Sequence, residues 1–174
     1  ARADYLTINV SSPNTPGLRS LQTGDALAAL LRPVAAARAA QAERLARPVP
    51  VLVKLAPDLD NDELEAALEA ILAARLDGVI IGNTTLGRAG LRSAHAHETG
   101  GLRGRPVGEL NTTVRTRVVR TVNGRIPVII APSWMRARRS YNCTPVWSMA
   151  GRGWCALVWR VNWVGIPRYE SAAG

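Results

Sequence analysis

Short apolar runs alternate with longer segments of helical periodicity through the first 130 residues of the chain. The runs are rich in β-branched residues and are bounded by turn-forming residues, which is typical of buried strands. Four strands are predicted, at residues 5–10, 49–55, 78–81 and 126–130. Because these strands are apolar throughout and alternate with helices, we expect them to pair in parallel through right-handed crossovers.

The clearest predicted helix starts near residue 60. Asp60 or Asn61 can cap it, and Asp62 and Glu63 suit the positive end of its dipole. Its apolar stripe consists of Leu64, Leu68, Ile71 and Leu72.

Two other helices are predicted, over residues 25–46 and over about 110–122. In the first of them, Pro33 marks a kink or a restart. A polar, glycine-rich excursion over residues 83–108 leads into the second. The apolar face of the first helix consists of Leu27, Leu30, Leu31 and Val34.

Polar residues follow three of the predicted strands directly. Ser12 and Asn14 follow the first strand, Lys54 ends the second, and Asn83 and Thr84 follow the third. In a (β/α)8 barrel such positions converge on the catalytic face, and a doubly wound sheet would also gather them at one edge. The absence of a GxGxxG fingerprint favours the barrel. The sequence therefore predicts an α/β fold, a partial (β/α)8 TIM barrel with about four of its eight strands recognisable.

The composition changes sharply near residue 131. Residues 1–130 hold 16 Lys and Arg against 12 Asp and Glu, whereas residues 131–174 hold six Arg against one acid. Both cysteines and all five tryptophans also lie in this tail, so Cys143 and Cys155 define no disulfide framework for the main body. The net charge of +9 raises the possibility of nucleic-acid or membrane binding, but much of the excess belongs to the tail.

The length of 174 residues is sufficient for one domain with a core. The sequence contains no uninterrupted run of about 18 apolar residues and no signal-peptide pattern. Because the first residue is Ala1 rather than Met and a strand follows almost at once, we expect a fragment or a processed chain.

Single motifs in this chain carry little information. The segment around Ser12 has the residues of an ordinary tight turn. Lys54 at a strand end would need an anionic partner to compensate its desolvation. His95 and His97 beside Glu98 are better explained by a solvated loop, and we expect no metal site. Ser-His-Asp, zinc-binding and P-loop patterns are absent from the sequence.

Four motifs taken together are far more specific than any one of them. They occur in order and are, in one-letter code, NVSSPNTPGLR at 9–19, VKLAPDL at 53–59, NTT at 83–85 and ETGGLRGRP at 98–106. This series resembles the class 2, quinone-dependent dihydroorotate dehydrogenases, and the resemblance covers about residues 3–130.

The resemblance implies a flavoprotein oxidoreductase with FMN that oxidises dihydroorotate to orotate in de novo pyrimidine (UMP) biosynthesis and passes electrons to a quinone. It also implies a peripheral position on the cytoplasmic face of the inner membrane, and no nucleic-acid partner. Ser12 matches the catalytic base, and serine rather than cysteine there indicates class 2. A serine needs positioning and a proton relay to act as a base, and Thr84 matches the threonine beside that relay.

The resemblance also implies which residues bind the ligands. Asn9, Asn14, Asn83 and Thr84 match the substrate-binding positions, where amides offer a donor and an acceptor together. The flavin-contacting positions match Asn9, Lys54, Gly82 and Gly104, with Lys54 as the cation that stabilises the reduced flavin. Gly82 departs from the threonine that is usual in the family.

The tail lacks the family's phosphate-binding segments. When suitable codons are chosen for residues 139–154 and read in another frame, they give a string that resembles the missing Leu-Val-Gln-Leu-Tyr-Thr-Gly segment. This predicts a deletion and a frame shift after about Ile130. We therefore interpret 1–130 as a partial flavin- and dihydroorotate-binding barrel and 131–174 as an aberrant basic tail. Alone, such a chain is expected to be inactive, to bind flavin weakly, and to be soluble or aggregated. One alternative is a nucleic-acid- or membrane-binding protein with an Arg/Trp tail, and another is a different flavin- or phosphate-binding barrel.

Overall fold

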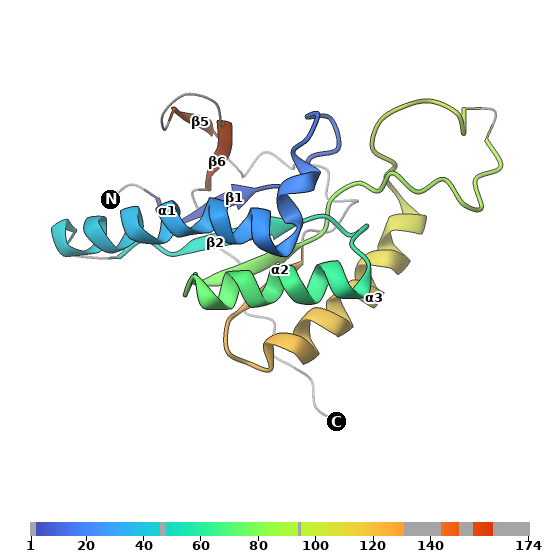
Figure 1. Cartoon of the computed structure of the whole chain (residues 1–174). Helices are drawn as coiled ribbons and strands as arrows, with labels where there is room; N and C mark the ends of the chain where they lie inside the picture. The colour runs from blue at the N-terminus through green and yellow to red at the C-terminus, as the bar shows by residue number, and fades with distance from the viewer. Residues whose placement is uncertain (1–2, 46–47, 94, 131–143, 150–154, 162–174) are drawn as a thin grey trace.

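The computed structural model describes residues 3–45, 48–93, 95–130, 144–149 and 155–161, the last two ranges through their backbone. Strands and helices alternate as far as residue 130, and two further strands follow (Figure 1). The elements are β1 (Tyr5–Asn9), a 3-10 helix η1 (Arg19–Gln22), α1 (Gly24–Arg44), β2 (Val51–Leu55), α2 (Asn61–Ala73), β3 (Gly78–Ile81), α3 (Arg105–Val122), β4 (Val128–Ile130), β5 (Thr144–Met149) and β6 (Cys155–Val161).

The sheet contains six strands in the order β4-β3-β2-β1-β6-β5. Strands β1 to β4 pair in parallel and in chain order, with Asn9 of β1 opposite Lys54 of β2 and Lys54 opposite Ile80 of β3. The predicted parallel α/β arrangement is thus confirmed. Over the residues that the structure describes, the strands form an open sheet rather than a closed barrel. The carboxyl ends of β1, β2 and β3 share one edge.

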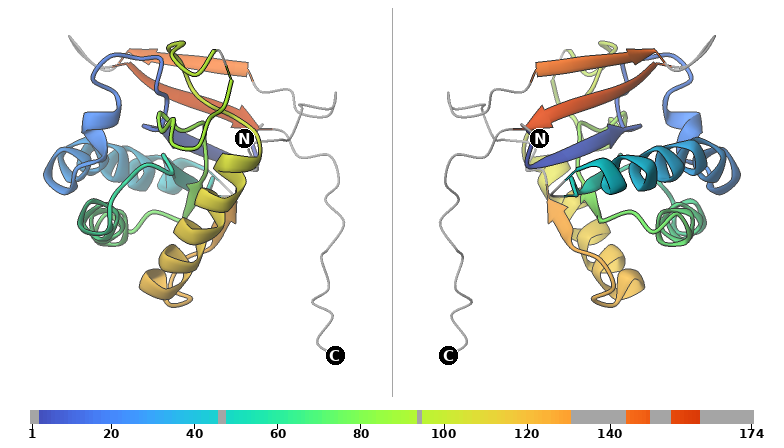
Figure 2. Two further views of the ribbon diagram at one scale, coloured as in Figure 1. Left: turned by 90° about the vertical axis from the view of Figure 1, so that its right-hand side faces the viewer. Right: turned by 90° about the vertical axis from the view of Figure 1, so that its left-hand side faces the viewer.

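The helices α1, α2 and α3 lie along one face of the parallel strands (Figures 1 and 2). Helix α1 packs against α2, and α2 packs against α3. Apolar side chains from the helices and from the strand face beneath them form one core. Its fully buried members include Leu27, Leu31, Val53, Leu55, Leu64, Leu68, Ile71, Val79, Ile81 and Val118.

Helix α2 begins as its sequence predicts. Asp60 is the cap, because its Oδ1 accepts from the Glu63 backbone N–H at 2.8 Å while Glu63 Oε2 accepts from the Asp60 N–H at 3.0 Å. Asn61 is the first helical residue. Of the predicted apolar stripe, Leu64, Leu68 and Ile71 are buried and Leu72 is half-buried.

Two helices differ from their predictions: α1 does not restart at Pro33, and α3 starts earlier than predicted. Helix α1 continues through Pro33, since a proline removes only one backbone hydrogen bond and this one lies on the exposed side. Helix α3 starts at Arg105 rather than near residue 110. Gly104, with φ +99°, ends the preceding loop there, and Pro106 suits the first turn.

Strands β5 and β6 had no counterpart in the sequence-based prediction. Strand β6 pairs antiparallel with β1, with Thr7 opposite Trp159, and β5 pairs antiparallel with β6. Val158, Trp159 and Val161 have high strand propensity, which favours this strand. None of the helices in the described ranges is long and apolar enough to cross a membrane.

Candidate active site

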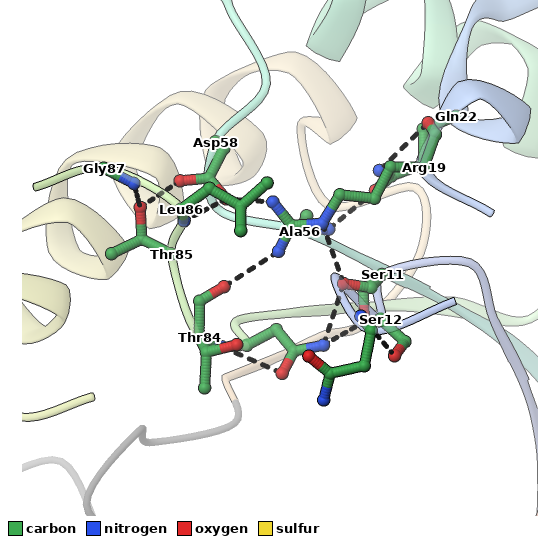
Figure 3. A network of polar contacts seen from close by, with 12 residues as sticks. Ser11, Ser12, Arg19, Gln22, Ala56, Asp58, Thr84, Thr85, Leu86 and Gly87 are labelled. Carbon is green, nitrogen blue, oxygen red and sulfur yellow. Dashed lines mark hydrogen bonds and ion pairs between the residues drawn. The ribbon is translucent and has the colours of Figure 1, made fainter. Parts of the chain in front are cut away.

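The polar residues at the carboxyl edge of the sheet form one hydrogen-bonded network (Figure 3). It joins the loop after β1, the loop after β2 and the loop after β3, which are far apart in sequence. The parallel register brings these three loops to the same edge, as the sequence predicted.

Ser11 lies between Asn9 of β1 and Asn83 of the loop after β3, two of the predicted substrate-binding residues. Its hydroxyl donates to Asn9 Oδ1 at 2.6 Å, and Asn83 Nδ2 donates to the same hydroxyl at 2.7 Å. Asn83 Nδ2 also donates to the Ser11 carbonyl at 3.0 Å, and the Ser11 N–H donates to Asn9 Oδ1 at 3.1 Å. Ser11 is fully buried, so these bonds are shielded from water.

The backbone of Ser11 determines how both amides are oriented. A backbone N–H only donates, so Asn9 must face it with Oδ1; a carbonyl only accepts, so Asn83 must face it with Nδ2. The hydroxyl of Ser11 consequently receives a proton from Asn83 and gives its own to Asn9. The hydrogen bonds described for Asn9 all use Oδ1, which leaves Nδ2 as the donor that Asn9 can offer a ligand.

Ser12 is half-buried and adjoins this network. Its Oγ accepts a hydrogen bond from the backbone N–H of Asn14 at 3.3 Å. The Asn14 side chain is exposed. The structure thus places Ser12 one residue from the centre of the network and Asn14 on the outer side of the same loop.

Thr84 is buried against the glycine-rich excursion. Its N–H donates to Asn83 Oδ1 at 2.8 Å. A Cβ added to Gly101 would lie 1.9 Å from Thr84 Oγ1, so Gly101 is required for the approach of Thr84. Thr85 and Leu102 form a bridge beside this contact, with N···O distances of 3.1 and 2.8 Å. The close neighbour of Gly101 is thus a threonine of the chain itself.

The remaining predicted cofactor residues lie at the same edge. Half-buried Lys54 is directly opposite Asn9 on the next strand. Gly82 is buried, has φ +118°, and donates its N–H to the Leu55 carbonyl at 3.4 Å. Gly104 caps α3, and a Cβ added there would meet nothing within 4 Å.

Sequence reasoning missed Arg19 and Asp58. Arg19 reaches the Ser11 and Thr84 carbonyls and forms an ion pair with Asp58, which also accepts from the Thr85 hydroxyl. Both residues stand inside recognised motifs, and their opposite charges after adjacent parallel strands were the available signal.

His95 lies in an exposed part of the excursion, where its Nδ1 is 2.8 Å from Glu98 Oε1. Among the described residues, no group of three or more His, Cys, Asp and Glu side chains is arranged to hold a metal ion.

The family model for dihydroorotate dehydrogenase matches residues 1–131. The chain belongs to the dihydroorotate dehydrogenase family. The resemblance seen in the four motifs is thereby confirmed, and the matched segment contains the whole network described above.

Curated relatives of the chain are named "Dihydroorotate dehydrogenase (quinone)". The one from Agrobacterium fabrum is 50% identical over 130 residues, which are 74% of this chain and 36% of the relative. The one from Idiomarina loihiensis is 48% identical over 127 residues, which are 73% of this chain and 38% of the relative. The chain thus spans little more than a third of the length of these relatives.

Solved dihydroorotate dehydrogenase structures show the same fold. The ligand-free enzyme from Eimeria tenella has a TM-score of 0.66 and 35% identity, covering 75% of this chain and 40% of that chain. The same enzyme in complex with ferulenol has a TM-score of 0.66 and 34% identity, covering 75% of this chain and 39% of that chain. These neighbours belong to a TIM-barrel family, so the predicted fold class is confirmed. The matches give no support to a nucleic-acid-binding protein.

Proposed function

We propose that this chain supplies the substrate-binding edge of a quinone-dependent dihydroorotate dehydrogenase, which oxidises dihydroorotate to orotate in pyrimidine biosynthesis. The observation that supports it best is the Asn9–Ser11–Asn83 network beside Ser12 at the carboxyl edge of a parallel sheet. The names of the curated relatives support the same reaction.

Amides of fixed orientation suit the proposed substrate. The ring of dihydroorotate carries carbonyl oxygens and N–H groups and therefore needs both donors and acceptors at defined positions. Asn9 offers its Nδ2 as a donor, because its Oδ1 is bonded to Ser11. Asn14, Asn83 and Thr84 complete the proposed contacts, with Asn14 approaching from the exposed side of the loop.

Ser12 is the proposed base that removes the proton from C5 of dihydroorotate. A serine hydroxyl is a weak base, so its placement and a path for the proton must compensate. The Asn14 N–H already bonds to the Ser12 Oγ, which orients the hydroxyl. Thr84 is the proposed neighbour of the proton path, held by its packing on Gly101.

The residues of this edge fit an FMN ring. When bound, FMN would supply the acceptor for the hydride from C6 of dihydroorotate, and a quinone would receive the electrons afterwards. Asn9 and Lys54, side by side on β1 and β2, would hold the polar part of the ring, and the Lys54 cation would favour negative charge there. Gly82 would contribute backbone alone, and the space beside Gly104 leaves room for a ligand.

By the same relationship we propose that the complete enzyme receives its quinone at a membrane surface, as a peripheral protein on the cytoplasmic face of the inner membrane. Co-sedimentation of the complete enzyme with liposomes checks this part separately.

A segment exchange tests the proposed reaction. Residues 3–130 replace the matching segment of the Agrobacterium fabrum relative, and dihydroorotate-dependent reduction of a quinone is measured. We expect activity in the chimera and its loss on Ser12→Ala, with FMN absorbance retained in both. A chimera that binds FMN but does not oxidise dihydroorotate contradicts the proposal, as does full activity after Ser12→Ala.

A further inference from the structure

Arg19 contacts all three loops of the site edge (Figure 3). Its Nε donates to the Ser11 carbonyl at 3.2 Å, and its Nη2 donates to the Thr84 carbonyl at 2.9 Å. Its Nη1 forms an ion pair with Asp58 in the loop after β2. We propose that Arg19 is a positioning residue that fixes the loop holding Ser12 against the strand end holding Asn83 and Thr84. The proposal rests on the proposed function, since those residues are the site.

The two carbonyls that Arg19 binds indicate which parts of the site it positions. The carbonyl of Ser11 shares a planar peptide unit with the N–H of Ser12, so holding the carbonyl also fixes the start of the Ser12 backbone. The carbonyl of Thr84 belongs to the residue whose side chain packs on Gly101. One guanidinium therefore sets the separation of two peptide units, each next to a group of the proposed reaction.

Asp58 holds Arg19 from the opposite side. Its Oδ1 accepts from the Thr85 hydroxyl, and its Oδ2 accepts from the Leu86 N–H at 3.4 Å as well as pairing with Arg19. The Arg19 side chain is only 17% exposed, so it has little room for other rotamers. The pair thus ties the β2 loop to the β3 loop and keeps the guanidinium plane in place.

An arginine is needed for this geometry. A guanidinium is a rigid planar fork whose nitrogens donate in different directions, whereas a lysine ammonium is a single point charge. Lysine could keep the ion pair with Asp58 but could not span both carbonyls. Each of the three guanidinium nitrogens of Arg19 has a partner within the chain, which supports a positional role.

Arg38 provides a matched control. It also pairs with an aspartate, Asp77, and donates to a backbone carbonyl, that of Arg75, at 3.2 Å. This pair lies at the amino-terminal end of β3, because Asp77 directly precedes that strand. Arg38→Lys therefore makes the same chemical change at the opposite edge of the sheet.

Hydrogen exchange of the full 174-residue chain, followed by mass spectrometry, tests the proposal. In Arg19→Lys we expect segments 10–18 and 83–88 to exchange about tenfold faster, which corresponds to loss of one hydrogen bond to a charged group. Protection of β1, β2 and β3 stays unchanged, and Arg38→Lys leaves both segments as in the wild type. In Arg19→Ala, millimolar guanidinium restores slow exchange, whereas methylammonium does not.

Millimolar orotate, added to the FMN-bound chimera with and without Arg19→Lys, separates this proposal from the proposed function. The unsubstituted chimera is the wild type of this comparison. We expect orotate to protect both segments in the wild type and less in Arg19→Lys. The proposal is overturned if the two segments of Arg19→Lys exchange at the wild-type rate. It is also overturned if they exchange faster but orotate protects them as strongly as in the wild type. Loosened loops together with no protection of the wild type support the positioning role but count against the proposed function. Should Arg19→Lys not fold, Asp58→Asn is judged by the same criteria.

Discussion

At the scale of single residues, Ser11 shows how the site is held together. Its hydroxyl has one donor and one acceptor partner, both of them side chains of the proposed site, and it has no exposed surface. Removing the hydroxyl would leave Asn9 Oδ1 and Asn83 Nδ2 each with one bond fewer in a place that water does not reach. Buried polar groups without partners are costly, because folding removes their bonds to water.

Ser11→Ala is therefore expected to destabilise the chain by about 1–3 kcal/mol. Ser12→Ala is the matched control, because Ser12 is half-buried and its hydroxyl has a single described partner. We expect its effect to stay within about 0.5 kcal/mol. Urea unfolding followed by circular dichroism measures both changes. Equal effects of the two substitutions would show that the Ser11 hydroxyl does not hold the amides.

Gly101 is the second residue at which a small change is expected to matter. The Cβ of Gly101→Ala would lie 1.9 Å from Thr84 Oγ1 and 2.4 Å from Thr84 Cβ, so Thr84 must move. We expect a loss of about 1–3 kcal/mol from this overpacking. In Gly108→Ala, where a Cβ meets nothing within 4 Å and the residue is helical, stability should rise by up to about 1 kcal/mol. Thermal unfolding measures the stability of both variants. A Gly101→Ala variant as stable as the wild type would disprove the close contact.

The sequence named several residues of the network but not the bonds between them. Asn9 was predicted because it matches a motif, and Ser12, Asn83 and Thr84 because they also follow apolar strands. Ser11, Arg19 and Asp58 were not, because a buried serine and an ion pair between two loops become visible only when the parallel register sets those loops side by side. Side chains that act on other side chains leave little trace in a local pattern.

At the scale of elements, the start of a helix can be predicted from local sequence where a side chain caps the backbone, as in α2. The box at Asp60 and Glu63 is local, so its residues specify the start of α2 without help from the rest of the fold. The start of α3 depends instead on the φ of Gly104, which no single sequence reveals. Strand β6 depends on pairing with β1, a contact between residues about 150 positions apart.

The cap of α2 gives a test at this scale. Asp60→Ala removes the acceptor of the Glu63 N–H and is expected to destabilise the chain by about 1 kcal/mol. Asp60→Asn should restore most of that loss, because an asparagine oxygen accepts equally well. Glu69→Ala, at an exposed position later in the helix, serves as the control. Denaturant midpoints measure all three, and an Asp60→Ala midpoint equal to that of Glu69→Ala would contradict the assigned cap.

At the scale of the whole molecule, the open sheet leaves one flank of α1 uncovered. A groove of about 770 Å³ runs between α1 and the strands β1 and β2, and its lining is almost entirely apolar. On the helix side it is lined at three- and four-residue spacing by Ala26, Ala29, Leu30, Pro33, Val34, Ala37, Arg38, Gln41 and Ala42. Of this stripe, the sequence analysis had named Leu30 and Val34 as part of the apolar face of the helix. Among the described residues, no element covers the outer part of this helical stripe, and only the tertiary structure shows this.

An apolar groove of this size should bind apolar molecules, because contact with them removes its surface from water. We expect the full chain to enhance the fluorescence of Nile red, an uncharged dye. Ala37→Glu places a carboxylate in the groove and should reduce the enhancement severalfold, since burying a charge beside the dye is unfavourable. Ala40→Glu, exposed on the same helix but outside the lining, adds the same charge without this effect. Equal enhancement in both variants would mean that the dye binds elsewhere, and the groove would then be covered in solution.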